Sequence, residues 1–94
     1  MFVVVSYDIP NDRRRTKIMK ALKNFGNHVQ YSVFECELLA DGYARLRGIL
    51  DKLIVPKEDN VRFYFFDEDA VKKIETIGTG GQIVRMQAYY FIGD

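Results

Sequence analysis

The first pattern along the chain is a run of four apolar residues, positions 2 to 5, followed by Ser6, Tyr7 and Asp8. A short stretch of aromatic and β-branched residues without charge is typical of a strand that is buried on both faces. We therefore expect a buried strand over residues 2 to 8 that ends in a carboxylate. In a regular strand, Tyr7 would point to the face of the sheet opposite to that of Asp8.

A helix is predicted directly after this strand. Pro10, Asn11 and Asp12 form a turn with the character of a helix N-cap. Gly26 is a typical stop signal, so the helix is expected over residues 12 to 25. Apolar residues recur within it at helical spacing, at Ile18, Leu22 and Phe25.

Residues 28 to 38 alternate as an extended segment does, but their apolar positions change parity. One parity holds Val29, Tyr31 and Val33, and the other holds Phe34, Cys36 and Leu38. A regular strand cannot move its apolar side chains from one face to the other. We therefore expect either a bulge or a break into two strands near residues 32 to 34.

A second helix and a further strand are predicted in the middle of the chain. The helix is expected over residues 41 to 54, and Pro56 ends the segment. Its predicted inner stripe consists of Tyr43, Leu46, Leu50 and Leu53. Residues 61 to 66, Val-Arg-Phe-Tyr-Phe-Phe, are apolar on both faces, which favours a strand that is central in the sheet or forms an interface.

The rest of the chain is less regular. The acidic turn at residues 67 to 69 can begin a short helical turn, and residues 72 to 77 have the pattern of a short strand. The glycine-rich segment 78 to 81 predicts a flexible break. Residues 88 to 92, Ala-Tyr-Tyr-Phe-Ile, predict a final strand.

This order of elements predicts an α+β fold, a ferredoxin-like βαββαβ sandwich formed by a single domain over residues 1 to 94. Its two helices would cover one face of an antiparallel sheet. The other face carries apolar residues too, and its simplest cover is a second copy of the chain, packed sheet to sheet in a homodimer. Residues 78 to 94 would form a linker and a C-terminal strand that packs on the partner subunit.

The charge distribution adds a candidate binding surface. The formal net charge is only +1, but residues 11 to 24 contain six cationic side chains and one anion. A basic helix in a nearly neutral chain indicates a local anionic partner, although a solvated helix face is the common alternative. Three consecutive arginines favour the first interpretation, because the guanidinium group suits bidentate phosphate contacts.

Other functions are excluded by composition. The single cysteine, Cys36, cannot form an intrachain disulfide and is expected to be a small buried hydrophobe. The chain has no apolar segment long enough to span a membrane, and its first residues do not form a signal peptide. We therefore expect a cytoplasmic protein without a membrane partner.

Asp8 is the candidate catalytic and metal-binding residue. A carboxylate can bind Mg²⁺ or Mn²⁺, and here it lies at a strand end beside a basic helix, as phosphodiester chemistry requires. The alternative is an ordinary turn residue. Because one carboxylate is a poor site by itself, catalysis requires a dimer that brings two copies of Asp8 together, and a cation would relieve their repulsion.

The predicted nucleic-acid-binding residues are the cations that begin the first helix, Arg13, Arg14, Arg15 and Lys17. Weaker candidates are Tyr7, the hydroxyl of Ser32 and the ring of Phe34, which could stack on a base. The only histidine, His28, is expected to face solvent and is not assigned as a general base. The nucleophile would then be a water molecule activated by the metal.

Several of these motifs carry a resemblance to a known family. They are Tyr7-Asp8-Ile9, Arg14-Arg15 with Lys17, the stretch from Gln30 to Glu35, and the stretch from Val61 to Tyr64. Together they resemble the small CRISPR-associated endoribonuclease-type subunit of spacer acquisition, the small partner of the CRISPR integrase. The resemblance covers nearly the whole chain, and residues 78 to 87 fall where the family has a variable link to its last strand.

The resemblance implies a ferredoxin-like homodimer that binds Mg²⁺ through Asp8 at the dimer axis. It implies a metal-dependent nuclease that cleaves single-stranded RNA or double-stranded DNA. It also implies that the dimer lies between integrase dimers and binds the DNA duplex to be inserted. Five residues fall on motif positions of the family as site candidates: Tyr7, Arg14, Arg15, Ser32 and Phe34.

Two other functions remain open at this point. The dimer could be a non-catalytic scaffold that binds duplex DNA and the integrase, because one carboxylate per subunit and no evident base make a sparse catalytic set. The chain could also be a toxin-type ribonuclease of the virulence-associated D type, which has the same fold.

Overall fold

The computed structural model describes residues 1–80 of the chain. Strands and helices follow one another in the predicted order. Their bounds are β1 Phe2–Asp8, α1 Asp12–Lys23, β2 Asn27–Gln30, β3 Val33–Glu37, α2 Ala40–Leu53, β4 Asn60–Phe66 and α3 Glu68–Lys72.

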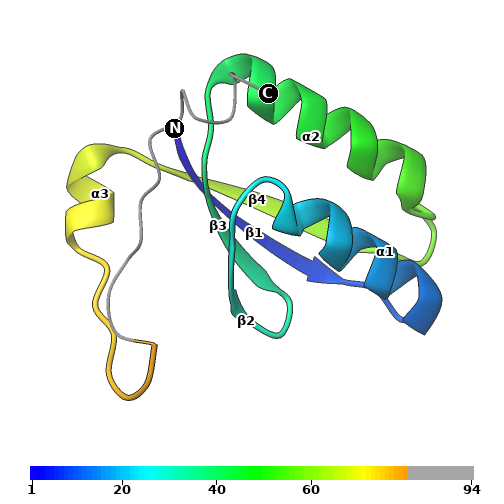
Figure 1. Ribbon diagram of the computed structural model, residues 1–94, viewed down its shortest axis with the longest axis horizontal. Helices are drawn as coiled ribbons and strands as arrows, with labels where there is room; N and C mark the ends of the chain where they lie inside the picture. The colour runs from blue at the N-terminus through cyan, green and yellow to red at the C-terminus, as the bar shows by residue number, and fades with distance from the viewer. Residues whose placement is uncertain (81–94) are drawn as a thin grey trace.

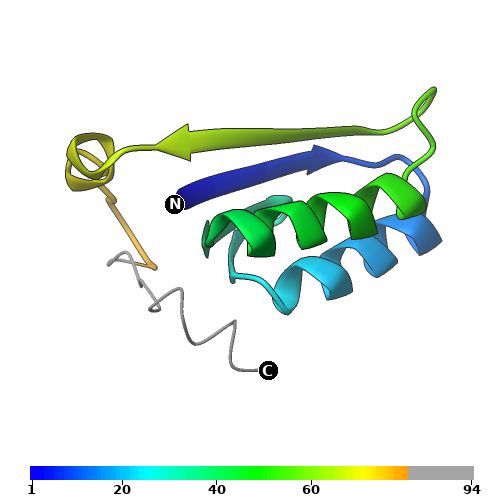
Figure 2. The same cartoon turned by 90° about the horizontal axis from the view of Figure 1, so that it is seen from above.

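The four strands form one antiparallel sheet in the order β2-β3-β1-β4. Both long helices, α1 and α2, lie on the same side of this sheet, and α3 lies beyond the end of β4 (Figures 1 and 2). This is the βαββαβ arrangement, so the predicted α+β, ferredoxin-like class is confirmed. β1 is a central strand, and its carboxyl end, with Asp8, leads directly into α1.

The core lies between the sheet and the two helices. From β1, Val3 and Val5 face the helices and are fully buried, and the alternation of the strand places Tyr7 on the same face. The predicted inner stripes are confirmed, with Ile18 and Leu22 of α1 packed in one cluster with residues of α2. The rest of that cluster includes Phe25, Phe34, Cys36, Leu38, Leu46 and Leu50.

The opposite face of the sheet has no helix of the described chain over it (Figure 2). At its centre Val4 pairs with Glu35 of β3 and Tyr64 of β4, and Ser6 pairs with Val33 and Arg62. We call this surface the open face. Its partial burial already raises the pKa of the Glu35 carboxyl, because desolvation disfavours the charged form.

The parity change in residues 28 to 38 corresponds to a break into two strands. β2 and β3 are joined by a turn at Tyr31 and Ser32, and the register shifts between His28 and Gln30. Val29 therefore belongs to β2, whereas Val33, Phe34 and Cys36 belong to β3, with Val33 on the open face and the other two in the core. Cys36 is buried as expected, and burial together with the nearby Glu35 carboxylate raises the pKa of its thiol to about 12.

Gly26 has a different role from the one predicted. Helix α1 ends at Lys23, and Gly26 has no positive φ, so it is not a helix stop of the left-handed kind. A Cβ atom at this position would lie 2.5 Å from the sulfur of Cys36 and 2.5 Å from the carbonyl oxygen of Glu35. Glycine is required here because the chain passes closely over β3.

One other prediction about elements is wrong, and one is narrowed. Residues 72 to 77 form no strand, because Asp67 caps the short helix α3, accepting a hydrogen bond of 2.8 Å from the Ala70 amide, and the chain after Lys73 is irregular. Among residues 1–80, β4 lies at an edge of the sheet and not at its centre, and its predicted part in an interface stays a prediction. Its apolar residues on the helix side, Phe63 and Phe65, instead pack edge to face against Tyr43 of α2.

The predicted final strand at residues 88 to 92 and most of the predicted linker lie outside the described residues. Within residues 1–80, no helix has the length and apolarity needed to cross a membrane.

Candidate active site at the end of the first strand

Asp8 is the last residue of β1 and is exposed. It pairs with Asn60 at the start of β4, and strand alternation places it on the open face with Val4 and Ser6. Within residues 1–80, its carboxylate takes part in no hydrogen bond or ion pair. Both of its oxygens are therefore free to accept a cation or water.

The turn between β2 and β3 is fastened to the same end of β1. The Tyr7 amide donates a hydrogen bond of 3.0 Å to the Ser32 carbonyl, and the Tyr7 hydroxyl donates one of 3.1 Å to the Tyr31 carbonyl. His28 Nε2 donates to the same Tyr31 carbonyl at 2.9 Å. Burial raises the pKa of the Tyr7 hydroxyl, and the charge of Arg15 opposes that rise. Tyr7 is thus a buried structural residue.

The cations of α1 divide into two groups. Arg13 and Lys17 are exposed, and within the described chain they have no ion-pair partner. Arg15 is half-exposed, donates to the Ile9 carbonyl at 3.0 Å and pairs with Asp12. Because Ile9 directly follows Asp8, Arg15 lies beside the end of β1. Arg13 and Lys17 therefore keep their full charge available for a phosphate backbone, and Arg15 shares its charge with Asp12.

Arg14 is engaged within the protein. Its Nε and Nη2 atoms donate to the two oxygens of Asp59 at 2.5 and 2.8 Å, and Nη2 also contacts Glu58 at 3.1 Å. The Asp59 side chain is fully buried and also accepts from the Val55 amide at 2.8 Å. Arg14 lowers the pKa of Asp59, and the Asp59 hydrogen bond raises that of Arg14. This pair fastens the loop before β4 to α1.

Of the weaker candidates, Phe34 does not fit its predicted contact. Its ring is completely buried and stacks on the His28 ring with centroids 4.5 Å apart, so base stacking by Phe34 is not possible in this structure. Ser32 lies in the turn beside the end of β1 and is partly exposed. His28 is exposed, as expected.

Sequence reasoning missed three residues near this site. Asp59 and Asn60 belong to a charged turn that has no recognisable motif, and only the pairing of β4 with β1 brings them to the end of β1. Tyr31 was grouped with the apolar positions of one strand. The signal that could have singled it out is its place at the parity change, where a turn exposes the side chain.

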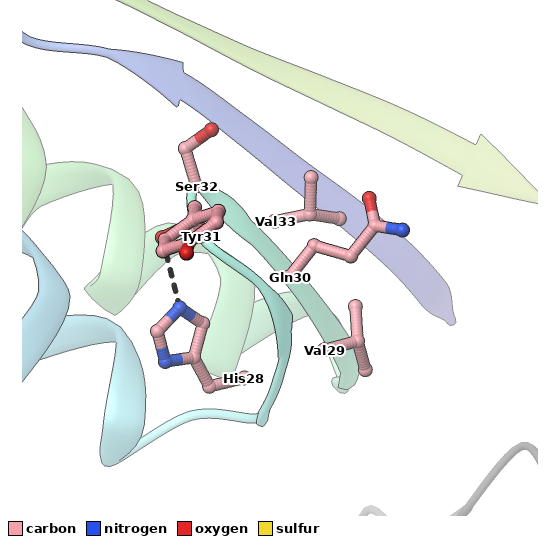
Figure 3. Close-up of a pocket in the computed structure, with 6 residues that line it drawn as sticks. All are labelled: His28, Val29, Gln30, Tyr31, Ser32 and Val33. Atoms are coloured by element: carbon pink, nitrogen blue, oxygen red, sulfur yellow. Dashed lines mark hydrogen bonds between the residues drawn. The ribbon is translucent and has the colours of Figure 1, made fainter. Parts of the chain in front are cut away.

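A concavity of about 670 Å³ lies along this turn. Figure 3 shows the residues that line it, His28 to Val33, with the hydrogen bond from His28 to the Tyr31 backbone carbonyl as a dashed line. Polar groups that can accept or donate hydrogen bonds, from Gln30 and Ser32, adjoin the apolar side chains of Val29 and Val33. The turn therefore offers both an aromatic surface and polar edges.

A cation site at Asp8 needs more than one chain. Within residues 1–80, no cluster of three or more histidine, cysteine, aspartate or glutamate side chains could hold a metal ion. Mg²⁺ is commonly held by one or two carboxylates together with waters. An exposed, unpaired carboxylate on the open face fits half of such a site.

Comparisons with known proteins agree with this geometry. Residues 1–74 match the family described as CRISPR associated protein Cas2. A relative from Chloroflexus aurantiacus, CRISPR-associated endoribonuclease Cas2 3, is 46% identical over 80 residues, which are 85% of this chain and 86% of the relative.

Solved structures are similar in fold as well. The crystal structure of Streptococcus pyogenes Cas2 at pH 6.5 superposes with a TM-score of 0.74 and 30% identity, covering 83% of this chain and 100% of that chain. A chain of a partial Cas6-RT-Cas1–Cas2 complex superposes with a TM-score of 0.75 and 28% identity, covering 90% of this chain and 98% of that one.

Proposed function

Because the chain belongs to the Cas2 family of CRISPR-associated proteins, we propose that it is a metal-dependent endonuclease that acts with the Cas1 integrase in spacer acquisition. Relatives named endoribonucleases and a similar chain in a Cas1–Cas2 complex support this proposal. The observation that carries the catalytic part is the exposed Asp8 carboxylate, which has no partner within residues 1–80. The cytoplasm, where CRISPR arrays lie, is the proposed location.

The active form is a homodimer joined through the open face. Val4, Val33 and Tyr64 form apolar surface there, and a second copy of the same sheet would cover it. A two-fold axis near the end of β1 brings the two Asp8 carboxylates together. The C-terminal strand predicted at residues 88 to 92 would then pack on the partner.

The two Asp8 carboxylates hold Mg²⁺ or Mn²⁺. When bound, the ion supplies positive charge next to the phosphodiester and lowers the pKa of a water molecule. Arg13, Arg15 and Lys17 bind the phosphates on either side, since all three side chains are exposed on the helix that follows Asp8. Arg14 holds the loop before β4 and so keeps Asn60 paired with Asp8.

A second candidate function is a non-catalytic scaffold that binds duplex DNA and Cas1. The observation in its favour is that the described chain offers a single carboxylate and no positioned general base at the site. Family membership removes the reason for the third possibility, a virulence-associated toxin.

Cleavage assays with the purified protein distinguish the two functions. Labelled single-stranded RNA and duplex DNA are incubated with Mg²⁺ across a range of pH, beside Asp8→Asn and a control, Asp41→Asn, which changes an exposed aspartate in the first turn of α2. The nuclease proposal expects a loss of at least about 100-fold in Asp8→Asn alone, since even residues behind a metal ligand contribute 10- to 100-fold. Equal cleavage by both variants would contradict it. Salt-sensitive duplex binding without cleavage by any variant would support the scaffold.

A further inference from the structure

The side chain of Tyr31 is unusual among the aromatic residues of this structure. It is 98% exposed, whereas its backbone carbonyl accepts two hydrogen bonds, from the Tyr7 hydroxyl and from His28 Nε2. The ring is therefore presented to solvent from a turn whose backbone is fixed. Because the backbone of the turn is already ordered, a flat ligand that stacks on the ring has only the side chain of Tyr31 to immobilise.

The turn that carries this ring lies beside the end of β1, where the candidate catalytic carboxylate is. The pairing of β1 with β3 ends at Ser6 and Val33, and the Tyr7 amide continues it to the Ser32 carbonyl. Tyr31 precedes Ser32, and Asp8 follows Tyr7. The two side chains consequently belong to neighbouring chain segments at the same end of the sheet.

The surroundings of the ring match the chemistry of a nucleobase. The residues that line the concavity beside it include Gln30 and Ser32, whose side chains can donate to and accept from base edges, and Val29 and Val33. Figure 3 shows these side chains extending from the same turn as the Tyr31 ring. Arg15, next to the end of β1, supplies positive charge for the adjoining phosphate.

We propose that Tyr31 stacks on an unpaired base of single-stranded RNA and so positions the adjoining phosphodiester at Asp8. The inference rests on the proposed nuclease function and names the form of its substrate. An unpaired base offers its face to an aromatic side chain, whereas bases in a duplex are covered by their neighbours. The buried ring of Phe34 cannot make this contact. Tyr31 therefore takes the base-stacking role that the sequence predicts for Phe34.

Binding is measured with a single-stranded RNA that contains one 2-aminopurine, in EDTA so that nothing is cleaved. Stacking quenches the fluorescence of this base. Tyr31→Ala is expected to weaken binding by about 5- to 100-fold and to remove the quenching, because one base–aromatic stack contributes roughly that much affinity. Tyr31→Phe keeps the ring and is expected to bind nearly as the natural chain does.

Two controls show whether the ring meets a base. Ile77→Ala removes an apolar side chain of equal exposure, 98%, and is expected to change nothing. An abasic strand of equal length and charge should bind the natural chain and Tyr31→Ala alike. Equal affinity of both proteins for the 2-aminopurine strand overturns the proposal. The proposal is also overturned if Tyr31→Ala loses as much affinity for the abasic strand or for duplex DNA as for the 2-aminopurine strand. The contact would then be with the backbone or with paired nucleic acid.

This test is independent of catalysis. If Asp8→Asn still cleaves, the proposed function fails, but the fluorescence result still decides whether Tyr31 stacks. If Tyr31→Ala binds normally, stacking fails, and cleavage through Asp8 is unaffected.

Discussion

At the scale of single residues, the pair of Arg14 and Asp59 shows how one contact changes a functional assignment. The run of three arginines looks uniform in the sequence, yet the structure uses Arg14 to bind a fully buried carboxylate and leaves Arg13 exposed. Arg14 therefore contributes first to the folded state and only through it to the site.

We predict that Asp59→Asn lowers the free energy of unfolding in a pH-dependent way. Arg14 lowers the pKa of Asp59 in the folded chain, so protonation favours the unfolded chain. The stabilisation is complete above the ordinary aspartate pKa of about 4 and is lost as the pH falls through the lower folded value. Urea unfolding should show a large difference in the free energy of unfolding between the natural chain and the variant at pH 7. This difference should narrow below pH 4.

The control for this prediction is Asp51→Asn. Asp51 also pairs with an arginine, Arg47, but at 3.8 Å and with 61% of its side chain exposed. Loss of the Asp51 charge should change the free energy of unfolding only slightly at every pH, because exposed ion pairs contribute little to stability. An equally small effect for Asp59→Asn would mean that the buried pair does not hold the loop.

Gly26 supports a second prediction at this scale. Gly26→Ala should cost about 1–3 kcal/mol, the usual cost of overpacking, because the added methyl group would meet Cys36 and the backbone of β3. Gly48→Ala, in the interior of α2 with no atom within 4 Å of the added group, should instead stabilise the protein by roughly 0.5–1 kcal/mol. Thermal unfolding of both variants measures the contrast, and equal effects would contradict the close approach at Gly26.

At the scale of elements, the local pattern of apolar residues predicts a helix or strand correctly where its periodicity agrees with the burial of the side chains. The apolar run of β1, the Asn11 cap, which accepts from the Arg14 amide at 2.9 Å, and the parity change between Val33 and Phe34 all have local causes. The edge position of β4 could not be predicted in this way, because it depends on which strands flank β1. The contact of Arg14 with Asp59 joins residues 45 positions apart, which no local pattern encodes.

The same limit applies to the candidate site. Asp8 was identified because a strand end beside a basic helix is visible in the sequence. Asn60 and the turn at Tyr31 come close to Asp8 only because their strands pair with β1. Their position near Asp8 therefore could not be predicted without the fold.

Helix α1 should bind nucleic acid through its exposed cations. We predict that Lys17→Ala weakens duplex binding and makes the negative slope of log affinity against log salt concentration shallower by about 0.9, the value for one phosphate contact. Lys72→Ala, which removes an exposed cation from α3 beyond the far end of β4, is the control and should leave the slope unchanged. Binding titrations at several salt concentrations give both slopes, and equal slopes for the two variants would exclude α1 as the specific contact.

At the scale of the whole molecule, the proposed dimer requires a second copy of the chain to cover the open face. Tyr64 lies on this face, paired with Val4, and is 45% exposed. We predict that Tyr64→Glu converts the dimer to a monomer and removes cleavage, because a buried, unpaired carboxylate is costly in a sheet-to-sheet interface. Light scattering after size-exclusion chromatography measures the mass.

Ile49→Glu is the control for the open face. Ile49 is 37% exposed and belongs to α2, on the other side of the sheet. This variant should remain dimeric and active. Dimers of unchanged mass for Tyr64→Glu would show that the open face is not the interface.

In the proposed dimer, two subunits share one cation through their Asp8 carboxylates. Titration of the protein with Mn²⁺, followed by electron paramagnetic resonance of the free ion, counts bound ions directly. We predict one ion for every two chains, with binding lost in Asp8→Asn and unchanged in Asp41→Asn. One ion per chain, or binding that survives Asp8→Asn, would contradict the shared site.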